Sequence, residues 1–163
     1  LLNRKTFEEH FARITAPTPD FGPVEPGADT PQQWLAVIDI DHFKNVNDSY
    51  GHPLGDQVIR SLAWLLKQRL RKTDHIGRSG GEEFAVVLPD TDAATALKVL
   101  DEIRQRFAEI SYPAQPMDLS CTFSCGIAEL HDGVDSKALS KRADEALYEA
   151  KHSGRNRSAV YPA

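Results

Sequence analysis

Four carboxylates lie at the ends of apolar segments, where a folded chain could bring them together. Asp39 and Asp41 end the apolar run 34–40. Glu82 and Glu83 directly follow two adjacent glycines. A carboxylate against apolar surface is costly unless it is paired, hydrogen-bonded or bound to metal. Several hard oxygen ligands suit Mg²⁺ or Mn²⁺, which keep water molecules and take phosphate oxygens, so these residues favour metal-dependent chemistry on a phosphorylated substrate.

Three of these acids also have a purely structural interpretation, whereas Asp39 does not. Asp41 could be the N-cap of a helix over residues 42–50. Glu82 and Glu83 could be solvated side chains of a hairpin, because adjacent glycines accept the positive φ angles of a tight turn. Successive strand residues point to opposite faces, so the two glutamates are not expected to share one role. The hairpin by itself leaves a surface turn and a functional site equally open.

Cations near the C-terminus are the candidates for phosphate binding. The chain has no glycine-rich phosphate loop of the G-x-x-x-x-G-K type, so metal and scattered cations would have to hold phosphate. Lys151 and Arg155 bracket the end of a helix predicted over residues 136–151. Taken alone, their positions are better explained by cations that stabilise a helix C-terminus.

The elements expected to position these residues alternate between strands and helices. The run 34–40 predicts a strand buried on both faces. The other predicted elements are helices over 3–14, 42–50, 54–70, 93–110 and 136–151, a hairpin of strands 75–78 and 84–88, strands over 119–130 and 158–161, and a proline-rich loop over 15–31. Because a hairpin forces antiparallel pairing, this order predicts an α+β fold and not a doubly wound parallel sheet.

Bulk properties exclude several classes of protein. With 163 residues the chain is long enough for one domain with a real core, and it contains no apolar run long enough to span a membrane. Its net charge of −5 argues against binding to a nucleic-acid polymer. Cys121 and Cys125 are expected to be buried free thiols in a reducing cytoplasm. The chain opens on Leu1 without an initiator methionine, so we expect a cytoplasmic domain excised from a longer protein that could be membrane-anchored.

Four segments in order carry a resemblance to a known family. They are residues 39–48, 51–56, Arg78 with Gly-Gly-Glu-Glu-Phe at 80–84, and 146–157. Together they resemble the GGDEF domain of diguanylate cyclases, and the similarity extends over nearly the whole chain as a single domain, 1–163. The resemblance implies a five-stranded, mainly antiparallel sheet flanked by helices, with the palm-like, ferredoxin-like architecture of nucleotide cyclases.

The resemblance also implies a reaction and a set of site residues. Two GTP molecules would condense into cyclic di-GMP with release of two pyrophosphates, using two Mg²⁺ (or Mn²⁺) ions per active site. The implied metal ligands are Asp39, the Ile40 carbonyl, Glu82 and Glu83, and the implied substrate contacts are Asn47, His52, Asp56, Gly80, Gly81, Lys151 and Arg155. Glu82 and Lys44 are the implied catalytic residues, and Asn47 and Asp56 would hydrogen-bond guanine. Phe43 is expected to pack beneath the site.

Regulation follows from the same resemblance. One domain would hold one GTP, so activity requires a homodimer, driven by an N-terminal sensory or dimerisation domain. Arg71 and Asp74 match the family's R-x-x-D site, at which cyclic di-GMP acts as an allosteric inhibitor. The chain departs from some members by carrying Glu102 where they add an arginine, although Arg104 and Arg106 are close in sequence.

The alternative is a catalytically silent member that binds GTP or cyclic di-GMP and signals through contacts with other domains. Silent members usually lose an acid of the hairpin or the aspartate at the end of the strand. This chain keeps Asp39, Glu82 and Glu83, so the sequence favours an active enzyme.

Overall fold

A five-stranded sheet with helices on both faces forms the centre of the computed structural model, which describes residues 9, 32–131 and 134–162. The strands are β1 (Gln33–Ile40), β2 (His75–Arg78), β3 (Glu83–Leu88), β4 (Phe123–Leu130) and β5 (Ser158–Val160). The helices are α2 (Phe43–Tyr50), α3 (His52–Arg69), α4 (Ala93–Glu109) and α5 (Ser136–His152). The predicted helix over 3–14 and the proline-rich loop over 15–31 fall on segments outside the described residues.

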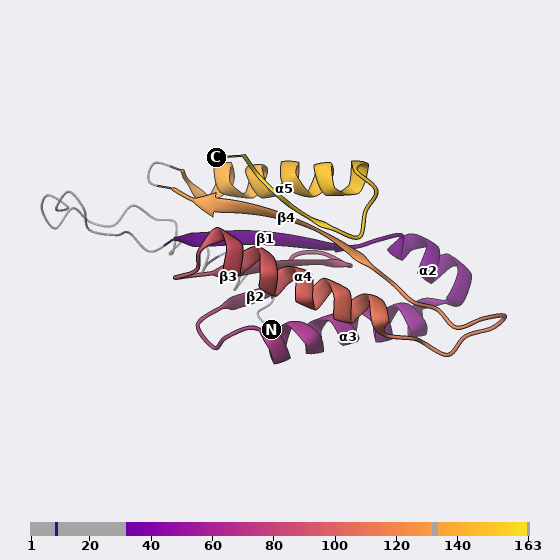
Figure 1. Ribbon diagram of the computed structural model, residues 1–163. Coiled ribbons are helices and arrows are strands. Elements are labelled where there is room, and N and C mark those ends of the chain that lie inside the picture. The colour runs from indigo at the N-terminus through magenta and orange to yellow at the C-terminus, as the bar shows by residue number, and fades with distance from the viewer. Residues whose placement is uncertain (1–8, 10–31, 132–133, 163) are drawn as a thin grey trace, which may run out of the picture.

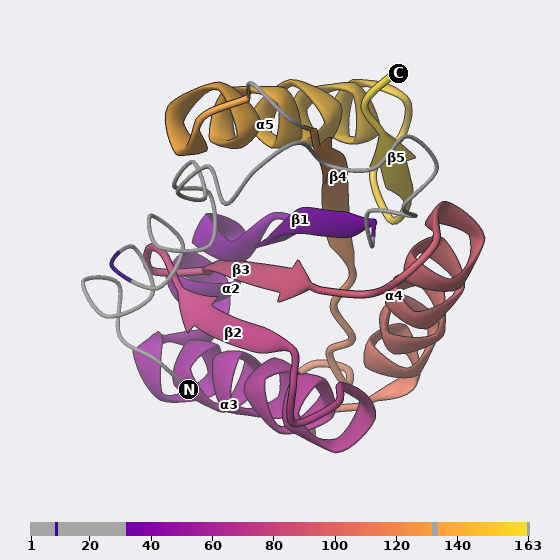
Figure 2. The ribbon, with the colours of Figure 1, turned by 90° about the vertical axis from the view of Figure 1, so that its left-hand side faces the viewer.

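The sheet has the strand order β2-β3-β1-β4-β5. Its pairs are antiparallel except for β4 and β5, which run parallel. The element order strand, helix, strand, strand, helix, strand is that of ferredoxin-like folds, with α2, α5 and β5 added. The predicted α+β class and mainly antiparallel sheet are therefore confirmed. Helix α5 covers one face of the sheet, and α3 and α4 cover the other (Figures 1 and 2).

The alternation of side chains along β1 divides the core into two layers. One set of its residues packs with α3 and α4, and it comprises Trp34, Ala36, Ile38 and Ile40. Leu35 instead packs with Leu139 and Ala143 of α5. The strand is thus buried on both faces, as its continuous apolar run predicts. Asp39 and Asp41 continue this alternation on the α5 face.

Two element boundaries differ from the sequence-based expectation by more than one residue. Helix α3 begins at His52 instead of residue 54, because Pro53 fits the first turn, where its missing N–H has no helical acceptor. Strand β4 begins at Phe123 instead of residue 119. Phe123 lies opposite Ile40, the last residue of β1, so the ladder has no partner on which to continue.

Two buried thiols complete the core. Cys121 and Cys125 are free and buried, as predicted. Burial raises the pKa of the Cys121 thiol to about 11 and that of Cys125 to about 12. Both side chains are therefore neutral core groups and not nucleophiles. Among the described residues, no helix is long and apolar enough to cross a membrane.

Candidate active site

Six of the predicted site residues converge where β1 ends and α2 begins, at the right-hand end of β1 in Figure 1. A cavity of about 250 Å³ opens there. Its lining includes Asp39, Ile40, Lys44, Glu82, Lys151 and Arg155. The Ile40 amide donates to Glu82 O at 3.3 Å, which joins the strand end to the hairpin turn. Three segments that are distant in sequence therefore meet at one opening.

Asp39 is buried, and the positively charged Lys151 lies against its carboxylate. Its side chain accepts a hydrogen bond from Lys151 Nζ at 2.6 Å, and the residue is only 7% exposed. Lys151 belongs to the last turn of α5, so it also lies where a cation stabilises a helix terminus. The ion pair connects α5 to the acidic end of β1.

Asp41 has a different role from the predicted helix cap. The N-cap position of α2 is His42, and no side-chain hydrogen bond caps that helix. Asp41 instead points to the α5 face, as the alternation of β1 requires. There its carboxylate accepts from Thr122 Oγ1 at 2.7 Å, Ser124 Oγ at 2.7 Å and the Asn156 amide at 3.1 Å. This network was not predicted from the sequence, although the two-residue spacing from Asp39 places both acids on one face.

Backbone strain gathers around the same cavity. Among the described residues other than glycine, those with positive φ are His42, Asp90, Arg155 and Asn156. His42 and Arg155 line the cavity, and Asn156 follows Arg155. Each such residue costs about 1–3 kcal/mol, which persists only where the surroundings hold the conformation, as commonly happens at functional sites.

The two hairpin glutamates differ in environment, because Glu82 lies in the turn and Glu83 is the first residue of β3. Glu82 lines the cavity, whereas Glu83 is not part of its lining. Glu83 pairs with Asp39 in the β1–β3 register. Glu83 is exposed, but partial loss of contact with water raises the pKa of its side chain. The negative charges of Asp39, Asp144 and Glu82 raise this pKa further, against the lowering effect of Lys151. Asp144 on α5 is a member of this acidic group that the sequence analysis did not identify.

The turn between β2 and β3 is held by Arg78. Its Nε donates to Gly80 O at 3.1 Å, and its Nη2 donates to Gly81 O at 2.6 Å. A Cβ added to Gly81 would meet nothing within 4 Å, so the turn presents an open backbone surface. Gly80 and Gly81 thus lie beside the cavity without contributing to its lining.

The predicted guanine contacts lie at the junction of α2 and α3. The side chain of Asn47 packs so closely on Gly55 that a Cβ there would overlap Asn47 Oδ1. Asp56 follows Gly55 and is exposed, as is His52 at the start of α3. Phe43 is buried in the core, as predicted. Asn47, His52 and Asp56 lie outside the lining of the 250 Å³ cavity, so the base and the phosphates would occupy adjoining regions.

The R-x-x-D residues form a separate cluster at the other end of the hairpin strands. His75, which follows this motif, pairs with Val87, whereas the glycine turn lies beyond the pair of Arg78 and Phe84. Arg71 Nη2 donates to Asp74 Oδ1 at 3.0 Å, and the Asp74 side chain is only 2% exposed.

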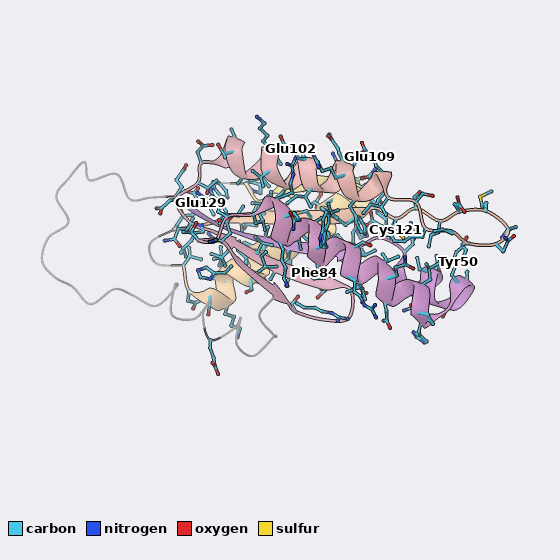
Figure 3. The ribbon with its side chains drawn as sticks, turned by 90° about the horizontal axis from the view of Figure 1, so that it is seen from below. Tyr50, Phe84, Glu102, Glu109, Cys121 and Glu129 are labelled. Atoms are coloured by element: carbon cyan, nitrogen blue, oxygen red, sulfur yellow. The ribbon has the colours of Figure 1, made fainter. Side chains whose placement is uncertain are left out.

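Further contacts hold Arg71 and the charged residues around it in place. Arg71 Nη2 also reaches Pro89 O at 2.6 Å and Thr91 Oγ1 at 2.7 Å. Glu102 on α4 pairs with Arg69 on α3 at 3.6 Å, and Figure 3 labels Glu102 where the two helices lie side by side. Arg104 points away from this region, toward Asn156. Of the nearby arginines, Arg104 is therefore not available to the R-x-x-D cluster.

A larger cavity of about 640 Å³ lies at the opposite end of β1. Its carboxylate, Glu129, is engaged by His131 Nε2 at 3.4 Å and by Gln32 Nε2 at 3.3 Å. It contains no second acid and none of the predicted site residues. Size alone does not make it the better candidate.

The donor set of the smaller cavity fits a hard divalent cation. Asp39 and Glu82 supply carboxylates and Ile40 a backbone carbonyl, with no thiol in the lining. No group of three or more His, Cys, Asp or Glu side chains close enough to hold a metal occurs among the described residues. Mg²⁺ is commonly held by one or two carboxylates, water and substrate phosphates, so this set is sufficient for it.

Comparisons with known proteins give one consistent result. The family profile described as "Diguanylate cyclase, GGDEF domain" matches residues 1–157. Over 126 residues the chain is 44% identical to diguanylate cyclase DgcP of Pseudomonas aeruginosa, covering 77% of this chain and 19% of the relative. Over 158 residues it is 42% identical to diguanylate cyclase DgcM of Escherichia coli K12, covering 96% of this chain and 36% of the relative. The chain thus spans well under half the length of these curated relatives.

Solved structures agree with the sequence comparisons. The crystal structure of the GGDEF domain of DgcB from Caulobacter crescentus, in complex with c-di-GMP, matches with a TM-score of 0.86 and 36% identity. The match covers 99% of this chain and 91% of that chain. The active GGEEF domain of a diguanylate cyclase from Vibrio cholerae matches with a TM-score of 0.75 and 40% identity, over 81% of this chain and 84% of that chain.

Proposed function

The chain belongs to the GGDEF domain family of diguanylate cyclases, and from this we propose that it condenses two GTP molecules into cyclic di-GMP. The observation that carries the proposal is the cavity that brings Asp39, Glu82 and Lys151 together at the end of β1. Relatives of this identity that are named diguanylate cyclases support the same reaction.

In each step the 3′-hydroxyl of one GTP attacks the α-phosphate of the other. A phosphorus–oxygen bond forms to the 3′-oxygen, the bond to the β-phosphate breaks, and pyrophosphate leaves with the electron pair. Glu82, which lines the cavity, accepts the proton of the attacking hydroxyl. Two such transfers close the ring and release two pyrophosphates.

Asp39, the Ile40 carbonyl and Glu82 would hold Mg²⁺ (or Mn²⁺), with Glu83 as a further ligand. When bound, two ions would supply positive charge that activates the attacking hydroxyl and stabilises the departing pyrophosphate. Lys151 balances the charge of Asp39, at 2.6 Å. Lys44 and Arg155 line the same cavity and neutralise the triphosphate.

Base recognition is assigned to the junction of α2 and α3. Guanine offers N1–H and N2–H₂ donors, which suit the Asp56 carboxylate, and an amide can both donate and accept. Asn47 packs on Gly55, the residue before Asp56, because Gly55 has no side chain to exclude it. His52 has a weaker role near the substrate. The open backbone of Gly80 and Gly81 lets GTP lie against the hairpin turn.

Catalysis requires two domains face to face, since each holds one GTP. We infer a homodimer with the substrates at its interface, two-fold symmetric and promoted by a sensory or dimerisation domain outside this chain. Cyclic di-GMP inhibits at the R-x-x-D cluster. Because Asp74 is nearly fully buried against Arg71, it holds the arginine, and the half-exposed Arg71 side chain contacts the ligand.

The reaction is tested by incubating the protein with GTP and Mg²⁺ and separating the nucleotides by chromatography. Cyclic di-GMP is the expected product with GTP, and no cyclic dinucleotide is expected with ATP. Absence of product at high protein concentration, and also after fusion to a dimerising coiled coil, would refute the enzymatic proposal. Binding of GTP without turnover would instead support the silent signalling module.

A further inference from the structure

The turn after α5 carries Arg155 to the cavity on a backbone conformation that chains seldom adopt. Gly154, Arg155 and Asn156 have successive φ angles of 121°, 61° and 47°. Glycine alone enters this region without steric cost, so a turn with two other residues there persists only where its surroundings hold it. The contacts of the turn therefore decide where the Arg155 guanidinium lies.

Hydrogen bonds from three directions hold this turn. The Arg155 amide donates to Ala150 O at 3.0 Å, which closes the end of α5. The Asn156 amide donates to the buried Asp41 carboxylate at 3.1 Å. From α4, Arg104 Nη1 donates to Asn156 O at 3.1 Å and to Asn156 Oδ1 at 2.9 Å.

Arg104 is itself fixed before it reaches the turn. Its Nε donates to Asp101 Oδ1 at 3.1 Å, one turn earlier on α4, and its side chain is only 17% exposed. A charged donor forms stronger hydrogen bonds than a neutral one, and Arg104 is already oriented toward Asn156, which is itself exposed. Arg104 thus connects α4 to the turn through two contacts with a single residue, Asn156.

We propose that Arg104 is a positioning residue for the triphosphate site: by holding Asn156, it keeps the turn in the conformation that presents Arg155 to the cavity. The inference rests on the proposed function, in which Arg155 binds the triphosphate. Within the described part of the chain, the Arg155 guanidinium makes no hydrogen bond or ion pair, so it is available to an anionic ligand. Arg104 does not line the cavity and acts only through the backbone of the turn.

Hydrogen exchange tests, without any ligand, whether Arg104 holds the turn. In Arg104→Ala, the amides of Arg155 and Asn156 should exchange about tenfold faster, because the turn opens more often. Lys98→Ala removes the same charge from an exposed position on α4 and should leave both rates unchanged. Unchanged protection in Arg104→Ala would overturn the proposal.

Calorimetry tests whether the contact of Arg104 with the turn affects the affinity for ligand. Arg104→Ala should weaken binding of a non-hydrolysable GTP analogue with Mg²⁺ about tenfold, which corresponds to about 1.4 kcal/mol. Binding of guanosine should stay unchanged, because guanosine has no phosphate for Arg155 to contact. An equal loss for both ligands, or a loss for neither, would contradict the positioning role.

Substitutions at Asn156 separate the backbone conformation from the amide contact. Asn156→Gly adopts positive φ without cost and keeps the carbonyl acceptor, so it should bind the analogue more tightly than Asn156→Ala. Equal affinity of the two variants would overturn the argument from conformation. The unaltered protein could bind neither ligand while the amides of the turn still exchanged faster in Arg104→Ala. The proposed function would then fail, but the role of Arg104 in holding the turn would be supported.

Discussion

Lys151 gives the buried Asp39 its counter-charge at 2.6 Å. A carboxylate as buried as this one carries a large desolvation penalty without a partner. Because Lys151 and Glu82 line the same cavity, a cation already lies at the acidic end of the site. We expect a metal ion at Asp39 to displace this ammonium toward the phosphates of the substrate, where Arg155 also lies.

Replacing the proposed base tests the chemistry at the residue scale. Glu82→Gln keeps the shape of the side chain but removes the proton acceptor, so turnover should fall by at least roughly 10²-fold. The melting temperature should change little, because Glu82 lies at a cavity and not in the core. Glu109→Gln, an exposed change on α4, is the control. Substantial activity in Glu82→Gln would remove the assigned role.

Glu83 makes stability depend on pH. Its pKa is raised first by burial and then by the surrounding acids, so the folded protein holds the proton more tightly than the unfolded chain. The ionised carboxylate therefore destabilises the fold, and stability falls as pH rises through the folded pKa. The effect is small, because the Glu83 side chain is exposed and water screens the charges around it. Below the ordinary pKa of 4.5 both states are protonated and this contribution disappears.

Glu83→Gln imitates the protonated acid at every pH. It should raise the melting temperature at pH 7.5 relative to the unaltered protein, and the gain should shrink below pH 4.5. Thermal unfolding at both pH values, with exposed Glu145→Gln on α5 as the control, measures the effect. A gain of equal size at both pH values would contradict the electrostatic explanation.

At the scale of elements, the close approach of α5 to β4 decides whether Lys151 reaches Asp39. A Cβ added to Gly126 of β4 would overlap the backbone of Ala143 and Leu147 on α5. The absence of a side chain at Gly126 thus allows α5 to lie directly on the strand. The last turn of α5 then brings Lys151 over the end of β1.

Adding one methyl group at this contact should separate the two elements. Gly126→Ala is expected to destabilise the protein by about 1–3 kcal/mol, because the overlap involves backbone that cannot move locally. Gly81→Ala is the stability control, since nothing lies within 4 Å of its added Cβ. Equal melting temperatures for the two variants would show that α5 is not held this closely.

The contact of α3 with α4 should set the affinity for product. Glu102 pairs with Arg69 at 3.6 Å and so offsets positive charge near Arg71. Glu102→Arg should tighten cyclic di-GMP binding, because a forked cation replaces an acid, and Arg71→Ala should weaken it. Isothermal titration calorimetry measures both changes.

Melting temperatures of the two variants separate an effect on cyclic di-GMP binding from an effect on folding. Arg71→Ala also loses contacts to Pro89 and Thr91, so its melting temperature should fall. Glu102→Arg carries no such loss of backbone contacts. If cyclic di-GMP affinity stayed the same in Glu102→Arg and in Arg71→Ala, the inhibitory site would have to lie elsewhere.

At the scale of the whole molecule, one domain offers one candidate cavity at the end of its sheet. The proposed reaction joins two GTP molecules, so a single domain holds only half of the reacting atoms. Activity per protomer should therefore rise with protein concentration, and fusion to a dimerising coiled coil should raise it at low concentration by roughly 10²-fold or more. Specific activity that is independent of concentration and of fusion would contradict the dimer.

The amino-acid sequence by itself determined the class of fold and the family. The alternation of side chains along a strand predicts which residues share a face, and the two glycines predict where the hairpin turns. Both features depend only on neighbouring residues. Strand geometry by itself places Asp39 and Asp41 on one face, and it predicted that Glu82 and Glu83 would not share one role. Those predictions hold because strand geometry relates residues one and two apart without any knowledge of the rest of the chain.

Only the tertiary structure decided what those side chains meet. Asp41 has local features of a helix cap, yet its partners Thr122, Ser124 and Asn156 lie 81 to 115 residues away. Likewise, Arg104 reaches Asn156 across 52 residues. Such contacts depend on how α4, α5 and the sheet pack together. Local spacing fixes the face of an element on which a residue lies, but packing between elements fixes its partner.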